Sequence, residues 1–155
     1  MHGAAEMSVT IEGSQLTIEL DTPLENLAGF EHAPRTEKQR AAVRAMAARL
    51  REPQSLFVPT PAASCTPGAV RLSSAVLPGE LLGETATASP GEAAKGHADL
   101  EAAFVFRCAN IGALQGLETS LLKTFRGIHK LKVQVAGPRG QSATVLEKGR
   151  TSVRW

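Results

Sequence analysis

The first twenty residues carry the pattern that most restricts the fold. Apolar and polar side chains alternate on both sides of "EGSQ", where Gly13 supplies a turn. A period of two is that of a β-strand with one buried face. Two such runs around a tight turn predict a β-hairpin. The residues expected to face the core are Met7, Val9, Ile11, Leu16, Ile18 and Leu20.

A helix is predicted over residues 36–52, after an irregular connection. Thr36 is a suitable N-cap, and Gln39 three residues later completes a capping box. The core-facing stripe at helical spacing is Val43, Met46, Ala47 and Leu50, and Pro53 follows the helix. The outer face is basic. We interpret it as a solvated helix face, with a groove for a partner as the alternative.

The remaining pattern alternates between strands and short helices. Strands are predicted at residues 68–78 and 97–108, a second hairpin at 129–148 and an edge strand at 151–155. Residues 111–128 are compatible with one or two short helices. Residues 79–96 lack periodicity and predict a flexible loop. We expect one α+β domain over 1–155, with a mostly antiparallel sheet and the long and short helices packed on one face.

Composition argues against several classes of function. The net charge is +2, and five Phe, one Trp and no Tyr leave few side chains for stacking on bases, so we expect no nucleic-acid partner. No apolar run approaches the roughly 18 residues that a membrane span needs. GxGxxG, HExxH and Walker patterns are missing from the sequence, and we predict that the protein is not an enzyme.

The two cysteines, Cys65 and Cys108, lie far apart and outside any CxxC or CxxH spacing. In an oxidising compartment they would form a disulfide closing a loop of about 44 residues, worth roughly 4 kcal/mol in the chain-entropy model. Two free thiols in the core are the alternative.

Histidines paired with carboxylates are the remaining candidates for chemistry. The pairs are His2 with Glu6, Glu31 with His32, and His97 with Asp99. Residues two apart on a strand project to the same face, so His97 and Asp99 would point together. Imidazoles and carboxylates are zinc ligands, and zinc takes about four of them. If these segments met after folding, three imidazoles would converge on one metal ion.

Ordinary structural roles are the alternative for each of these histidines. A histidine close to the N-terminus, such as His2, is commonly solvated, and His97 with Asp99 could be a surface pair. His32 could be a helix-entry residue that bonds the backbone. His129, beside Lys130, has the position of an ordinary residue at the start of a strand.

Several stretches in combination have a familiar form: "HGAAE", "GFEH" before the predicted helix, "AASC", "HADLEAAFVFRC" and "LKVQVAGPRGQSATVL". Together they resemble the ZrgA-like family of bacterial periplasmic zinc-binding proteins, formerly a domain of unknown function. The resemblance covers nearly the whole chain. The positions that match the histidine-bearing motifs of the family are His2, His32 and His97.

The resemblance implies a protein of the periplasm whose signal peptide has been removed, and it favours the disulfide. It also implies that the protein binds Zn²⁺ and assists an inner-membrane zinc transporter in zinc acquisition. One feature departs from the family: the stretch "GELLGETATASPGEAAKG" contains no histidine, whereas the corresponding loop is commonly histidine-rich. A set of many zinc sites on that loop is therefore not expected.

We therefore expect an exchangeable Zn²⁺ site built from a subset of four residues, with two carboxylates as further ligands or as partners that orient an imidazole. The four are His2, His32, His97 and Asp99, and the two carboxylates are Glu6 and Glu31. The alternative is an envelope protein-interaction module with structural histidines and no specific metal site. A thiol-dependent enzyme is a third, weaker hypothesis.

Overall fold

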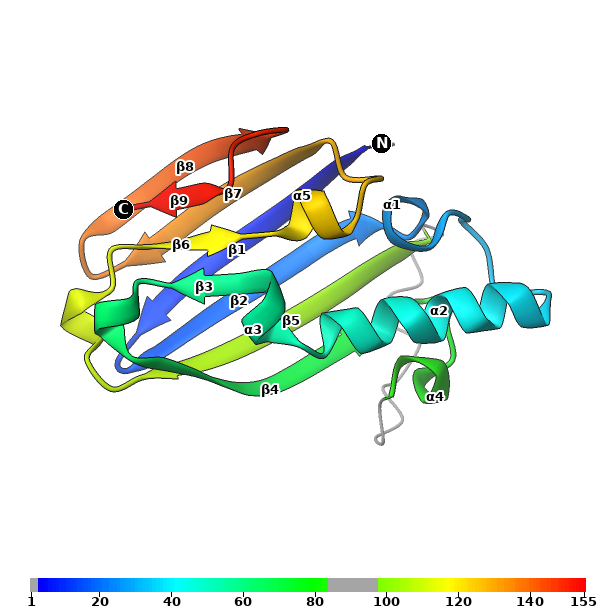
Figure 1. Cartoon of the computed structure of the whole chain (residues 1–155), viewed down its shortest axis with the longest axis horizontal. Coiled ribbons are helices and arrows are strands. Elements are labelled where there is room, and N and C mark those ends of the chain that lie inside the picture. The colour runs from blue at the N-terminus through cyan, green and yellow to red at the C-terminus, as the bar shows by residue number, and fades with distance from the viewer. Residues whose placement is uncertain (1–2, 84–97) are drawn as a thin grey trace.

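A six-stranded sheet dominates the structure, a computed structural model that describes residues 3–83 and 98–155 (Figure 1). Its strand order is β4-β5-β2-β1-β7-β8, and a three-stranded sheet has the order β3-β6-β9. The strands are β1 Ala4–Glu12, β2 Gln15–Pro23, β3 Phe57–Pro59, β4 Cys65–Ser73, β5 Asp99–Cys108, β6 Gly116–Thr119, β7 Lys130–Gly137, β8 Gly140–Glu147 and β9 Ser152–Arg154. The helices are α1 Glu25–Ala28, α2 Glu37–Leu50, α3 Pro53–Leu56, α4 Gly79–Leu82 and α5 Leu121–Thr124, with 3₁₀ turns η1 Pro61–Ala63 and η2 Ile111–Ala113. The predicted α+β class is confirmed.

The first hairpin has the predicted form. Glu12 pairs with Gln15 around the turn, where Gly13 has a positive φ of 60°. This register places all six predicted apolar side chains on one buried face. The polar residues of β1 and β2 consequently lie on the other face, together with those of β5, because β5 pairs antiparallel with β2.

One pairing was not predicted: β1 lies parallel to β7, with Ala4 opposite Lys130 and Thr10 opposite Ala136. The first and second hairpins therefore join through strands that are far apart in the sequence. Alternation shows which face of a strand is buried but not which other strand it pairs with, so the sheet order could not be derived from the pattern.

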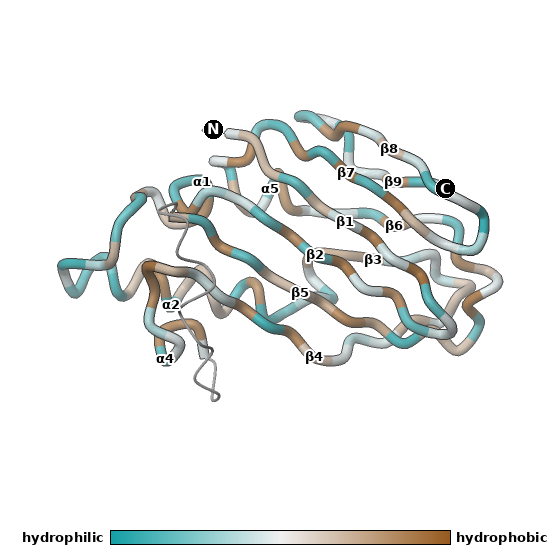
Figure 2. Tube along the Cα trace, turned by 180° about the vertical axis from the view of Figure 1, so that it is seen from behind, coloured by the Kyte–Doolittle hydropathy of each residue, from teal (hydrophilic) through white to brown (hydrophobic). Residues whose placement is uncertain are grey.

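The small sheet, α3 and α5 lie over the apolar face of the large sheet, whereas α2 extends beyond one end of that sheet with α4 beside it (Figure 1). Phe57 of β3 and Phe104 of β5 connect the two layers through an edge-on contact, with 4.9 Å between ring centroids. Both side chains are buried. Seen from behind, the strands of the large sheet lie in front of the small sheet, and they expose their second face (Figure 2).

Helix α2 confirms the predicted cap and stripe. The Thr36 hydroxyl accepts a hydrogen bond from the Gln39 amide N at 3.1 Å. The Gln39 side chain accepts a bond from the amide of Arg35 instead of closing the predicted reciprocal bond to Thr36. The buried residues of the helix are Val43, Met46, Ala47 and Leu50. Among the described residues, no helix is long and apolar enough to span a membrane.

The structure corrects several predicted boundaries. Strand β4 begins earlier than residue 68 and ends at Ser73, so Val76 lies outside it. The predicted loop at 79–96 opens with α4, in which Leu81 and Leu82 are buried, and residues 84–96 lie outside the described residues. Within the predicted helical stretch 111–128, η2 and α5 flank the strand β6. Strands β3 and β6 are three and four residues long, too short to show a period.

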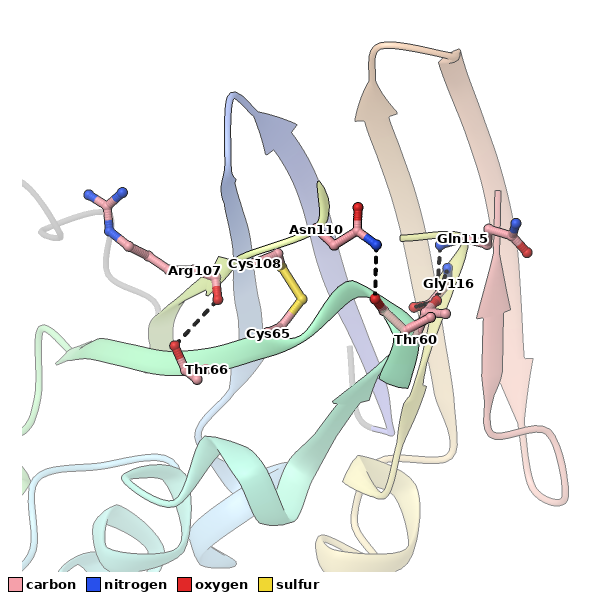
Figure 3. The surroundings of a disulfide bond; sticks show 9 residues. Thr60, Cys65, Thr66, Arg107, Cys108, Asn110, Gln115 and Gly116 are labelled. Carbon is pink, nitrogen blue, oxygen red and sulfur yellow. Dashed lines mark hydrogen bonds between the residues drawn. A yellow bond between two sulfur atoms is a disulfide. The ribbon is translucent and has the colours of Figure 1, made fainter. Parts of the chain in front are cut away.

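The Cys65–Cys108 disulfide is present and ties the edge strand β4 to β5 (Figure 3). The two cysteines lie directly opposite each other in the antiparallel register. Nearby, the Thr60 hydroxyl donates a hydrogen bond to the Gly116 carbonyl and accepts bonds from the amides of Gln115 and Gly116. The disulfide thus fastens two strands of the large sheet, and the Thr60 bonds fasten the end of β3 to the start of β6 in the small sheet nearby. The bridge is consistent with an oxidising compartment.

Candidate functional site

Four carboxylates lie close together on the exposed face of the large sheet, near the end opposite the disulfide. Glu6 of β1 is directly opposite Asp21 of β2, and Asp21 is directly opposite Glu101 of β5. Asp99 precedes Glu101 by two residues and therefore projects to the same face. We refer to Glu6, Asp21, Asp99 and Glu101 as the carboxylate row.

The carboxylate row is an electrostatically unfavourable arrangement. Partial burial raises the pKa of Asp21 above its ordinary value of 3.8, and repulsion from Asp99, Glu101 and Glu6 raises it further. With the described residues, none of the four carboxylates forms an ion pair or accepts a hydrogen bond. Lys132 of β7 lies opposite Glu6 in the register but does not form an ion pair with it. A bound cation would therefore relieve the repulsion.

His32 lies in the connection between α1 and α2 and is held by its neighbours. Its ring Nδ1 is 2.7 Å from the Ala33 carbonyl oxygen, and its ring centroid is 5.2 Å from that of Phe30. A carbonyl oxygen can only accept, so Nδ1 carries the proton of this hydrogen bond, and in the neutral ring Nε2 is the nitrogen with a lone pair. Many metal-binding histidines donate their other ring N–H to a backbone carbonyl in this way.

The structure brings together some of the predicted ligands and separates others. Asp99 and Glu6 belong to the carboxylate row, whereas Glu31 and His32 lie in the α1–α2 connection. His2 and His97 lie outside the described residues. Within 3–83 and 98–155, no three His, Cys, Asp or Glu side chains come close enough to hold a metal ion. The described residues alone therefore do not assemble a set of metal ligands.

Two members of the carboxylate row, Asp21 and Glu101, were not among the predicted ligands. A signal for them was present in the sequence. A two-residue turn at Gly13 and Ser14 pairs position 12 with 15, and therefore Glu6 with Asp21. Glu101 follows Asp99 by two residues and so lies on the same face.

The sequence comparison supports a zinc-related role. Residues 1–155 match a family described as ZrgA family zinc uptake protein, so the match covers the whole chain. A search of curated proteins finds no significant match. Because the family match extends over both hairpins, the long helix and the carboxylate row, the chain belongs to the ZrgA family of zinc uptake proteins.

Proposed function

We propose that this protein is a periplasmic zinc-binding accessory protein that takes up Zn²⁺ and passes it to an inner-membrane zinc transporter. The observation that carries the proposal is the match of the whole chain to a zinc uptake family. The role is one of binding and delivery, without a catalytic step. Zn²⁺ is the cargo, so its site must release the ion as well as hold it.

We propose that the ligands are a subset of His2, His32, His97 and Asp99, with Glu6 or Glu31 as a further ligand or an orienting partner. His2 directly precedes Gly3 at the start of β1, and His97 directly precedes Ala98 at the start of β5. In sequence, both histidines are therefore next to strand ends that carry the carboxylate row. Nitrogen and oxygen donors of these types match the preference of zinc.

The carboxylate row would supply attraction over a longer range than the bonds to the metal. A group of like charges on one surface raises the local concentration of oppositely charged ions. Binding of a divalent cation would also remove part of the repulsion that raises the pKa of Asp21. Protons would compete with zinc, because imidazole ligands must be neutral to bind.

Calorimetric titration with Zn²⁺ tests this function. At about pH 7.5 we expect binding much tighter than millimolar, with affinity falling as pH decreases through the histidine range near 6.5. The ligand set is tested by His32→Ala and His97→Ala, each of which should weaken binding about 10–100-fold if the residue is a ligand or orients one. His129→Ala is the control, since His129 is not a proposed ligand.

The competing function is an envelope interaction module with structural histidines. In that case His32→Ala and His97→Ala would lower the melting temperature and leave zinc binding unchanged. A wild-type protein that binds zinc no more tightly than millimolar would refute the zinc-carrier function.

A further inference from the structure

Asn26 has the most extensive side-chain hydrogen bonding at the end of the sheet that carries the carboxylate row. It lies in α1, and only 5% of its surface is exposed. Its Oδ1 accepts a bond from the Gly3 amide at 2.9 Å, and its Nδ2 donates to the Ala4 carbonyl at 3.0 Å. Nδ2 also donates to the Thr22 hydroxyl at 3.2 Å. One side chain thus bonds both β1 and β2.

The position of Asn26 is itself tightly fixed. A Cβ atom on Gly127 would lie 2.3 Å from the Asn26 carbonyl oxygen, so the two backbones are in close contact. Next to Asn26, the Gly3 carbonyl accepts bonds from the amides of His129 and Lys130 at 2.7 and 2.9 Å. Gly3 is therefore held through its N–H by Asn26 and through its carbonyl by the start of β7.

These contacts lie at the end of the sheet that carries the carboxylate row. The Asn26 bonds to Ala4 and Thr22 flank the pair of Glu6 and Asp21, which belongs to the carboxylate row. Leu24, two residues before Asn26, donates its amide to the Ala98 carbonyl at 2.7 Å and so fixes the residue before Asp99. The segment around Asn26 therefore contacts the ends of β1 and β2 and the chain entering β5.

A neutral amide suits this position because it both donates and accepts. A carboxylate could accept the Gly3 bond, but it could not donate to the Ala4 carbonyl. It would also bury a negative charge, because Asn26 is only 5% exposed. A neutral amide can thus tie the two strands together without that cost.

We propose that Asn26 is a positioning residue for zinc binding, whose side-chain amide clamps the start of β1 to the end of β2 and thereby fixes the described carboxylates Glu6 and Asp99 at this end of the sheet. The inference rests on the proposed zinc-binding function, and it assigns no metal contact to Asn26. Without these hydrogen bonds every ligand side chain would still be present, but the strand ends that carry the ligands would be held less firmly. Supporting groups of this kind change metal affinity by about 10–100-fold.

The test compares Asn26→Ala with Thr60→Ala. Thr60 also makes three hydrogen bonds that tie segments together, but it does so at the disulfide end (Figure 3). We expect Asn26→Ala to weaken zinc binding at least tenfold by calorimetry, and Thr60→Ala to leave it within about twofold of wild type. Melting temperatures of the metal-free proteins establish that each variant is folded at the titration temperature.

Amide hydrogen exchange of the metal-free protein gives a readout that does not depend on zinc. Exchange at the Gly3 amide should accelerate in Asn26→Ala, and exchange at the Gly116 amide should accelerate in Thr60→Ala. If Asn26→Ala does not fold, Thr22→Val is the second variant, because it removes only the hydroxyl that accepts a bond from Asn26. It should weaken zinc binding about two- to fivefold, a smaller loss than removal of the whole Asn26 side chain should cause. In that case, wild-type affinity in Thr22→Val would overturn the proposal.

Two further results would overturn the positioning role: unchanged zinc affinity in Asn26→Ala, or equal losses in Asn26→Ala and Thr60→Ala. The second would indicate a general loss of structure. A wild-type protein without zinc binding would refute the proposed function and this role with it, while the Gly3 exchange rates would still report whether the clamp exists.

Discussion

At one end of the large sheet β4 and β5 are joined by the Cys65–Cys108 disulfide, whereas at the other end β1 and β2 are joined through the amide of Asn26. The ten residues of β5 separate the two ends by roughly 30 Å. None of the proposed ligands that the structure describes lies at the disulfide end. The opposite end carries the carboxylate row, where like charges oppose each other on adjacent strands.

A sheet of this kind can carry a cluster of like charges without losing its register. Like charges directly opposite each other on paired strands are destabilising. Here the apolar face below them is buried, which fixes the register regardless of the charges above. The disulfide stabilises the fold by restricting the unfolded chain, whereas Asn26 holds the strand ends through hydrogen bonds in the folded protein. The covalent crosslink and the clustered carboxylates thus lie at different ends of the sheet.

The largest expected effect comes from removing the disulfide. Cys65→Ala combined with Cys108→Ala should lower the free energy of unfolding by up to about 4 kcal/mol, because the unfolded chain regains the freedom of a long loop. If loss of the disulfide at one end of the large sheet does not disturb the other end, the zinc affinity of the folded variant should stay within about twofold of wild type. Denaturant unfolding and calorimetry measure the two quantities. A tenfold loss of zinc affinity would show that the two ends are coupled.

Gly3 and Gly116 lie at opposite ends of the molecule, and neither tolerates a side chain. Gly3 has a φ of +83°, which disfavours any other residue, and a Cβ atom on Gly116 would lie 2.4 Å from the Val153 carbonyl oxygen. Gly3→Ala and Gly116→Ala should each cost about 1–3 kcal/mol of stability. Only Gly3→Ala should also weaken zinc binding, because Gly3 lies at the end of the sheet held by Asn26. Equal zinc affinity in the two variants would contradict the assignment of ligands to this end.

Removing the charge of Asp21 should raise the stability of the metal-free protein slightly and weaken its zinc binding. The raised pKa of Asp21 means that its protonated form is favoured in the folded state, so its stabilising contribution is complete below the ordinary pKa of 3.8 and is lost as pH rises through the raised value. At neutral pH, Asp21→Asn should therefore stabilise the metal-free protein by about 0.2–1 kcal/mol.

Three measurements check the Asp21→Asn prediction. Denaturant unfolding should show the gain at neutral pH, with the gain disappearing in acid and decreasing at high salt. Calorimetry should show weaker zinc binding in the same variant, because part of the attraction for the cation is removed. A variant that is less stable than wild type at neutral pH would contradict the account of the carboxylate row.

Much of the local structure could be predicted from the sequence because it depends on short-range patterns. The alternation around Gly13 predicted the first hairpin, and the stripe from Val43 to Leu50 predicted the buried face of α2. The parallel pairing of β1 with β7 could not be predicted, since it depends on how separate units assemble. The small sheet was missed because its strands are three or four residues long.

The site was predictable to a lesser extent. The shared face of Glu6 and Asp99 depends on alternation and on the pairing of β1 and β5 with β2. The hydrogen bond of His32 to Ala33 and the clamp formed by Asn26 depend on irregular backbone near α1, for which no period exists. The sequence motif "GFEH" marked the position of His32 but not the ring nitrogen that is left to bind a ligand.

The position of β1 between β2 and β7 has a consequence for folding during biosynthesis. Its two neighbours are β2, which follows directly, and β7, which is translated only after most of the chain. Each hairpin can form by itself from nearby contacts, but their union requires closure of a very long loop and should be slow. Until β7 arrives, β1 has an open edge that could pair with another chain, so aggregation during biosynthesis should be greatest for chains cut short before Lys130.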